Sequence, residues 1–370
     1  MLKQLTASGN PPQNNRIFGR QIAFFAAFVL PVYKLLEVPS ILASFTKGDL
    51  LLPAFLHYLL QTGLLIAVLI AASRLEEPLL LHLERRLGKW INVFYILYAV
   101  FFLFYAVLPL LDVEKFVYAA FYDTSPTLFS FAAFFLFSAF LCTKGMKTLG
   151  RFSDFCLLLF LLPFFALLLL SLNEADATNL LPIFEQRFGH TVSAFTYTAP
   201  HFSDTVFLLP LIVNLRFEKG DGKKITLGYL FGGVCTLLFL GVFYGLYSTI
   251  APREHYAFSK IAQYFPALSV VGRIDLIFVY LLCVVLFFYT ATPLQYAVTF
   301  TARAIGTKKK ILLSAAVNFA AFLFVLFCNK YYDSLYAFFC NRLFPAFWFF
   351  SLPPLLLLFF RKEKGVKNNA

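Results

Sequence analysis

Two oppositely charged side chains lie in an otherwise apolar stretch near the start of the chain. Lys34 and Glu37 fall within residues 30–40, together with Tyr33 and two prolines. Proline removes a backbone donor and disrupts a helix. Ionisable side chains at bilayer depth are costly and usually face a protein interior or a wet cavity. An interrupted, charged first helix is typical of a transporter-type binding site.

The spacing of this pair permits two interpretations. Lys34 and Glu37 are three residues apart, so on a continuous helix they share a face and can form an ion pair. In the first interpretation this pair only neutralises two intramembrane charges. In the second, Glu37 exchanges protons or holds a substrate amine, while Lys34 supplies a fixed positive charge. The sequence leaves both open.

A second polar run, again with a proline, interrupts the apolar stretch 191–214. His201 and Asp204 are three residues apart, which predicts a hydrogen-bonded pair, since two ligands are too few for a metal. Freed backbone groups at both interruptions are expected to receive the carboxylate and amine of an amino acid. The candidate substrate-binding residues in this run are Tyr197, Thr198, His201, Ser203 and Asp204.

The composition places these residues in a membrane protein. Apolar residues make up 60% of the chain and charged residues 14%, far from the usual soluble balance. Apolar stretches long enough to cross a bilayer recur along the chain and are predicted to be helices. Ten spans are expected, near residues 21–45, 50–72, 90–111, 126–142, 155–172, 191–214, 225–250, 274–298, 311–328 and 343–360.

The position of the two interruptions predicts the architecture. They lie five spans apart, which favours an all-α integral membrane protein of ten helices in a 5+5 inverted repeat, with broken helices 1 and 6. The repeat halves are about 21–172 and 191–360 within one permease-like domain, 21–360. A cytoplasmic lead, 1–20, and a cytoplasmic tail, 361–370, flank that domain.

The net charge of +12 is explained by membrane orientation. With the N-terminus inside, cytoplasmic segments hold 22 of the 31 Lys and Arg residues and external loops hold 8. This bias predicts that both termini are cytoplasmic. The basic clusters are therefore expected to contact the lipid bilayer and no nucleic acid. Asp112, Glu114 and Lys115 are placed at the external end of the third span, where charges cost little.

The cysteines and histidines carry no metal or catalytic pattern. No CxxC or Cys/His metal spacing occurs, and no nucleophile–base constellation is present. We therefore expect no metal, no cofactor and no enzymatic activity. Cys328 and Cys340 flank the last predicted external loop and are able to form a disulfide if that face is oxidising.

Short motifs along the chain match a known pattern. The chain resembles the spore-germination permease family, the B subunits of germinant receptors, in the amino acid–polyamine–organocation transporter superfamily. The features that carry the resemblance are Pro39-Ser40 before a Gly48-Asp49 turn, Asn179-Leu180-Leu181-Pro182, Phe202-Ser203-Asp204-Thr205-Val206-Phe207 before Pro210, and Gly272-Arg273-Ile274-Asp275.

The resemblance implies a function and a location. It implies a small amino-acid-like solute bound between spans one and six, partner receptor subunits, and a place in the cell membrane or the spore inner membrane. Members of the family tend to have small residues at the first interruption, where this chain has Lys34 and Glu37. Two functions remain open: a germinant receptor subunit that signals through its partners, and a stand-alone proton-coupled amino-acid transporter.

Overall fold

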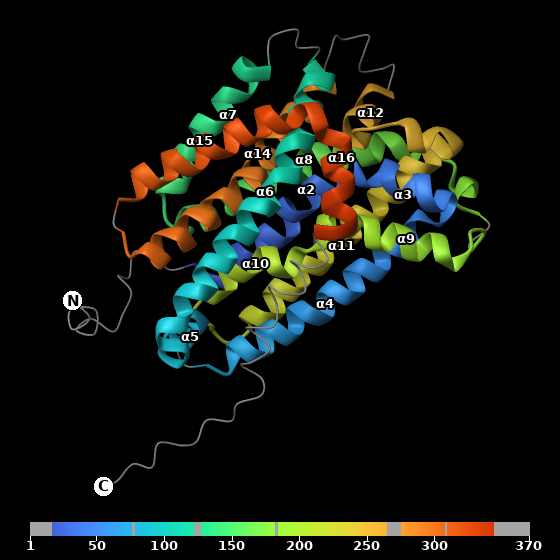
Figure 1. Ribbon diagram of the computed structural model, residues 1–370. Helices are drawn as coiled ribbons and strands as arrows, with labels where there is room; N and C mark the ends of the chain where they lie inside the picture. The colour runs from blue at the N-terminus through green and yellow to red at the C-terminus, as the bar shows by residue number, and fades with distance from the viewer. Residues whose placement is uncertain are drawn as a thin grey trace.

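The computed structural model describes residues 17–75, 78–121, 127–181, 184–264, 275–307 and 309–343. These residues are almost entirely helical, and the helices pack side by side in one bundle (Figure 1). Within the described residues no β-sheet forms, and a single isolated bridge joins Ile17 to Leu215. The predicted all-α class is confirmed.

Long apolar helices confirm a multi-pass membrane protein. Six of the ten predicted spans coincide with such helices. The predicted span 343–360 lies outside the described residues except for its first residue, and the tail 361–370 lies outside them entirely. The 5+5 repeat therefore stays a prediction. The segments that are long and apolar enough to cross a bilayer are Val38–Ser73, Gly88–Val117, Met146–Leu172, Asp221–Arg253, Leu276–Ile305 and Lys310–Cys328, with a shorter apolar helix at Phe131–Thr143.

The first helical run is interrupted immediately after Lys34. Residues 35–37 form a turn, and helix resumes at Val38. Pro39 lies in the first turn of the segment that resumes at Val38, where the missing N–H group would have no helical partner. Pro31 lies before the interruption, within the continuous helical run that ends at Lys34. The segments are α1 (Gly19–Phe24), the π-helical η3 (Phe25–Val29), α2 (Leu30–Lys34), α3 (Val38–Thr46) and the short η4 (Lys47–Leu50).

The carbonyl groups released by this turn are already bonded. The Leu35 carbonyl accepts from the Phe258 amide at 3.2 Å, and the Leu36 carbonyl accepts from the Ala257 amide at 2.9 Å. Both donors lie at the start of α12 (Ala257–Tyr264). These two carbonyls are used by α12 in this structure, and the expectation that backbone groups of the interruption receive a solute stays a prediction.

The second interruption separates three short segments: α9 (Phe188–Thr198), η7 (Ala199–Phe202) and α10 (Asp204–Val213). Ser203 lies between η7 and α10, and its hydroxyl donates to the Pro200 carbonyl at 3.0 Å. The Thr205 amide donates to the Gln61 side-chain oxygen at 3.1 Å. Gln61 belongs to α4 (Leu51–Ser73), so α4 satisfies a backbone donor at the start of α10.

Two glycines allow α11 (Asp221–Tyr247) to approach the N-terminal segment closely. A Cβ atom at Gly232 would lie 2.8 Å from the Ala26 carbonyl oxygen, and one at Gly228 would clash with the Ala23 backbone. This contact places Tyr229, between the two glycines, in the interior.

The third predicted span is longer than expected. Helix α6 runs from Ile91 to Phe121 and continues past Pro109. Asp112 and Glu114 are 0% and 4% exposed, so their prediction as inexpensive external charges is wrong. The reason is that α16 (Tyr332–Phe338) covers this end of α6, since the Tyr332 hydroxyl donates to the Asp112 carboxylate.

The remaining helices complete the bundle, and all six cysteines in it are free and buried. Cys328 and Cys340 therefore form no disulfide. The remaining segments are α5 (Leu79–Leu87), η5 (Gly88–Trp90), α7 (Thr127–Thr143), α8 (Met146–Leu172), η6 (Ala177–Leu180), η8 (Ser248–Arg253), α14 (Asp275–Ile305), α15 (Lys310–Cys328), η9 (Asn329–Tyr331), α16 (Tyr332–Phe338) and η10 (Phe339–Leu343).

Candidate functional site

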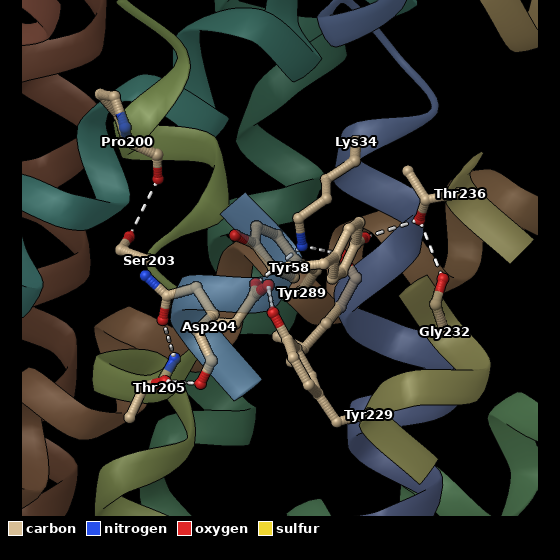
Figure 2. Close-up of polar contacts among 12 residues, drawn as sticks. Lys34, Tyr58, Pro200, Ser203, Asp204, Thr205, Tyr229, Gly232, Thr236 and Tyr289 are labelled. Atoms are coloured by element: carbon tan, nitrogen blue, oxygen red, sulfur yellow. Dashed lines mark hydrogen bonds and ion pairs between the residues drawn. The ribbon is translucent and has the colours of Figure 1, made fainter. Parts of the chain in front are cut away.

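A buried ion pair joins the two interruptions. The Lys34 Nζ atom lies 2.7 Å from the Asp204 Oδ1 atom, and both side chains are about 1% exposed (Figure 2). Lys34 is the last residue of α2 and Asp204 is the first residue of α10. A cation at a helix C-terminus and an anion at a helix N-terminus are both stabilised by the helix dipole. Each charge therefore has two sources of compensation.

Hydroxyl groups and aromatic rings enclose this pair. The Tyr229 hydroxyl donates to the second Asp204 oxygen at 2.8 Å, and the Lys34 ammonium donates to the Leu30 carbonyl at 3.3 Å. The ammonium also lies 5.4 Å from the ring centroid of Phe202 and 5.7 Å from that of Tyr58, within the range of a cation–π attraction. The pair is thus fully surrounded by protein atoms.

A hydrogen bond joins the Tyr58 side chain to α11. The Tyr58 hydroxyl donates to the Thr236 hydroxyl at 2.8 Å, which in turn donates to the Gly232 carbonyl at 3.0 Å (Figure 2). Because Thr236 and Gly232 are one turn apart on α11, the chain of hydrogen bonds fixes the ring beside Lys34.

Lys34 pairs with Asp204 and not with Glu37. The prediction of a Lys34–Glu37 pair assumed a continuous helix, and the turn at residues 35–37 removes that geometry. Glu37 is 9% exposed and lies next to the Tyr332 hydroxyl, with Asp112 among its charged neighbours. The interruption therefore directs the two charges to different parts of the bundle.

His201 and Asp204 do not form the predicted pair. The His201 Nε2 atom lies 2.9 Å from the Tyr336 hydroxyl, and its ring stacks on Tyr33 at a centroid distance of 5.2 Å. His201 is in η7 and Asp204 begins α10. The change of helix at Ser203 separates residues that a regular helix would align.

A second polar group lies beside the first. The Asp112 carboxylate accepts from the Tyr33 and Tyr332 hydroxyls, each at 2.6 Å. Tyr33 precedes Lys34 in the chain and stacks on Tyr289 at 5.0 Å. Asp112 therefore ties α2, α6 and α16 together directly next to the ion pair.

The other predicted site residues lie at the edge of the ion pair. Tyr197 is partly buried and its ring lies 5.3 Å from that of Phe45. Thr198 is buried and donates to the Ala194 carbonyl at 2.7 Å. The Thr198 and Ser203 hydroxyls thus donate to carbonyls of their own segment. Neither Tyr197 nor Thr198 contacts Lys34 or Asp204 through a hydrogen bond in the described part of the chain.

Sequence reasoning missed Asp112, Tyr229 and the tyrosines of α16. A signal for Asp112 exists, because the apolar run of α6 continues on both sides of it from Ile91 to Phe121. No such signal exists for Tyr229, since one tyrosine in an apolar helix is most often a packing residue.

The arrangement is suited to binding charged groups. Across the described residues, no cluster of three or more His, Cys, Asp or Glu side chains has the geometry of a metal site. The site instead offers one buried cation and one buried anion at opposing helix ends. A zwitterion has the complementary charges.

Comparison with known proteins identifies the family. A family model described as spore germination protein, the spore permease family, matches residues 54–333. No curated protein matches the sequence. Among solved structures, the manganese transporter of Eremococcus coleocola in complex with an aromatic bis-isothiourea substituted compound is 14% identical, with a TM-score of 0.48 over 92% of this chain and 77% of that chain.

A point mutant of the same Eremococcus coleocola transporter is 13% identical, with a TM-score of 0.49 over 95% of this chain and 80% of that chain. The family match covers well over half of the present sequence. The chain therefore belongs to the spore germination permease family.

Proposed function

We propose that this protein binds a small amino-acid-like solute between the interruptions at Lys34 and Asp204, and that binding drives signalling or transport. The observation that supports the proposal is the buried ion pair, which joins two helix ends 170 residues apart in the chain. In this proposal the two interruptions belong to helices 1 and 6 of a ten-helix 5+5 inverted repeat.

The proposed binding step exchanges one ion pair for two. The solute carboxylate takes the place of Asp204 beside the Lys34 ammonium, and the solute amine takes the place of Lys34 beside the Asp204 carboxylate. Every buried charge then keeps a partner, which matters because an unpaired buried charge is strongly destabilising. The Tyr229 hydroxyl, 2.8 Å from Asp204, holds that carboxylate during the exchange.

Solutes with only one of the two charges should bind poorly. Such a solute leaves Lys34 or Asp204 buried without a partner, and truncating one member of a buried charge pair costs about 2–5 kcal/mol. We therefore expect at least about a 30-fold loss of affinity for the single-charge analogue.

In this proposal the structure represents the solute-free, closed state of the protein. The Lys34 and Asp204 side chains are about 1% exposed and their charged atoms are 2.7 Å apart, so there is no room for a solute between them. A solute therefore requires the ends of α2 and α10 to move apart, and this movement is the event proposed to be coupled to signalling or transport.

A binding assay tests the proposal. The protein in lipid nanodiscs is titrated with a panel of small amino acids, their methyl esters and the matching amines. The panel should reveal at least one amino acid that binds, with the ester and amine at least about 30-fold weaker. Lys34→Met should abolish binding, whereas Lys224→Met, on an exposed lysine, should not. Binding of the ester as tightly as the parent amino acid contradicts the proposal.

Transport by the protein alone is the second candidate. The observation that favours proton coupling is Asp112, which is fully buried and accepts two tyrosine hydroxyls but forms no salt bridge with the described residues. Proteoliposomes loaded in a pH gradient should take up the bound amino acid if the protein transports it. Binding without uptake favours a receptor subunit that acts through partner subunits in the spore inner membrane, with both termini cytoplasmic.

A further inference from the structure

A groove follows the seam between α4 and α11 on the outside of the bundle, where Figure 1 places α4 at the periphery. Three hollows make up this groove. Residues 66–73 and 222–227 enclose about 480 Å³ at one end, and Phe55 and Leu237 line both of the other two hollows, of about 270 and 470 Å³. Thr62 lines the middle hollow and Ile66 lines the first. Since these two residues are one helical turn apart, the hollows follow one another along the seam.

The groove has the length and the surface of a lipid contact. From residue 51 to residue 73, α4 rises about 33 Å, which is close to the thickness of a bilayer core. Both helices belong to segments able to cross a membrane. The rims are apolar and exposed, with Leu59 at 61%, Leu227 at 66% and Val234 at 54%.

The two ends of the groove differ in their free charge. Asp49 lines the end near α3, but its carboxylate accepts from the Phe184 amide at 2.6 Å and the Gln186 amide at 2.9 Å. Lys223 lines the opposite end and is exposed. Among the described residues it forms neither a hydrogen bond nor an ion pair, whereas the neighbouring Lys224 pairs with Asp221 at 3.7 Å. The groove thus offers one uncompensated cation.

From these observations we infer that the groove binds an anionic phospholipid, with the acyl chain along the α4–α11 seam and the headgroup at Lys223. Hydrocarbon matches the apolar rims, and an anionic headgroup matches the free ammonium. A transmembrane helix is a rigid cylinder with a diameter of about 10–12 Å. A flexible acyl chain follows three consecutive hollows more readily than a rigid helix does.

Native mass spectrometry of the detergent-purified protein tests this inference with phosphatidylglycerol and phosphatidylcholine of identical acyl chains. Phosphatidylglycerol should be retained preferentially. Lys223→Glu should reduce its retention at least about fivefold, since one basic residue near anionic lipid contributes about that factor. Lys224→Glu is the matched control and should have a much smaller effect, because Lys224 does not line the groove.

A second variant tests the acyl-chain part of the site. Gly63 lies on the exposed face of α4 between Leu59 and Ile66, and a Cβ atom there would meet nothing within 4 Å. Gly63→Phe should therefore fold normally, which thermal unfolding in phosphatidylcholine nanodiscs checks, and should weaken retention of both lipids.

Three outcomes would overturn the inference. They are equal retention of the two lipids, equal loss from Lys223→Glu and Lys224→Glu, and thermal stabilisation by soluble glycerol 3-phosphate as large as that by phosphatidylglycerol. If a helix of another protein occupies the groove instead, mass spectrometry should detect a complex with a second polypeptide, and Gly63→Phe should dissociate it. That result would also contradict the lipid inference.

Discussion

Removal of the Lys34 ammonium is the sharpest test of the energetics of the site. Lys34→Met leaves the Asp204 carboxylate about 1% exposed, with the Tyr229 hydroxyl as its remaining hydrogen-bond donor. Breaking a buried ion pair by removing one partner costs about 3–5 kcal/mol. The Tyr229 hydrogen bond is already present in the wild-type protein, so it does not compensate the variant. We therefore expect the free energy of unfolding to fall by the full amount, about 3–5 kcal/mol.

The double variant separates the charge effect from loss of packing. Lys34→Met combined with Asp204→Asn removes both charges and keeps an oxygen that accepts from Tyr229. We expect the double variant to be at least about 2 kcal/mol more stable than Lys34→Met alone, because a buried ion pair replaced by neutral groups is often close to neutral in stability. Lys224→Met, on an exposed lysine, should change stability by less than about 1 kcal/mol.

Unfolding titrations with SDS in mixed micelles, followed by helical circular dichroism, measure these differences. A Lys34→Met cost below about 1 kcal/mol would show that the carboxylate is compensated by other groups. A double variant as unstable as the sum of the two single variants would show that the charges do not interact. Either result would refute the assignment of the pair as a coupled element.

Three further predictions concern packing and covalent structure. Asp112→Leu leaves the buried Tyr33 hydroxyl and the half-buried Tyr332 hydroxyl without this acceptor and should cost about 1–3 kcal/mol for the buried one in the same SDS titration; a change below about 0.5 kcal/mol contradicts the hydrogen-bonded role. Gly232→Val should prevent stable folding, because a Cβ atom at Gly232 lies 2.8 Å from a backbone oxygen, whereas Gly222→Val meets nothing within 4 Å and should yield monodisperse protein by size-exclusion chromatography. Alkylation of the denatured, unreduced protein should label Cys328 and Cys340 fully by mass spectrometry, and a mass lacking two labels would contradict their free state.

The two charged residues of the site were predictable, because charged side chains are conspicuous in apolar stretches of sequence. Lys34 and Asp204 are both visible as charges in apolar stretches that also contain proline, and the structure brings them together. Their pairing was not predictable, because spacing along the chain favours local partners such as Glu37. The partner that forms is 170 residues away, and only tertiary packing selects it.

Asp112 illustrates a different limit of the sequence. The predicted third span ends before Asp112, so the Asp112 carboxylate was expected to be exposed to water. In the structure α6 continues to Phe121, and α16 covers Asp112. Hydropathy alone cannot distinguish a charge that ends a span from one that is buried by a later helix. The tyrosines that bond to Asp112 come from α2 and α16, so no local pattern marks them.

The most direct test of the central claim is the structure of the protein with a bound amino acid identified in the panel. We predict that the solute carboxylate contacts the Lys34 ammonium, that its amine contacts the Asp204 carboxylate, and that these two side chains move apart from their present 2.7 Å. A solute bound elsewhere, or bound while the Lys34–Asp204 contact stays intact, would contradict the account.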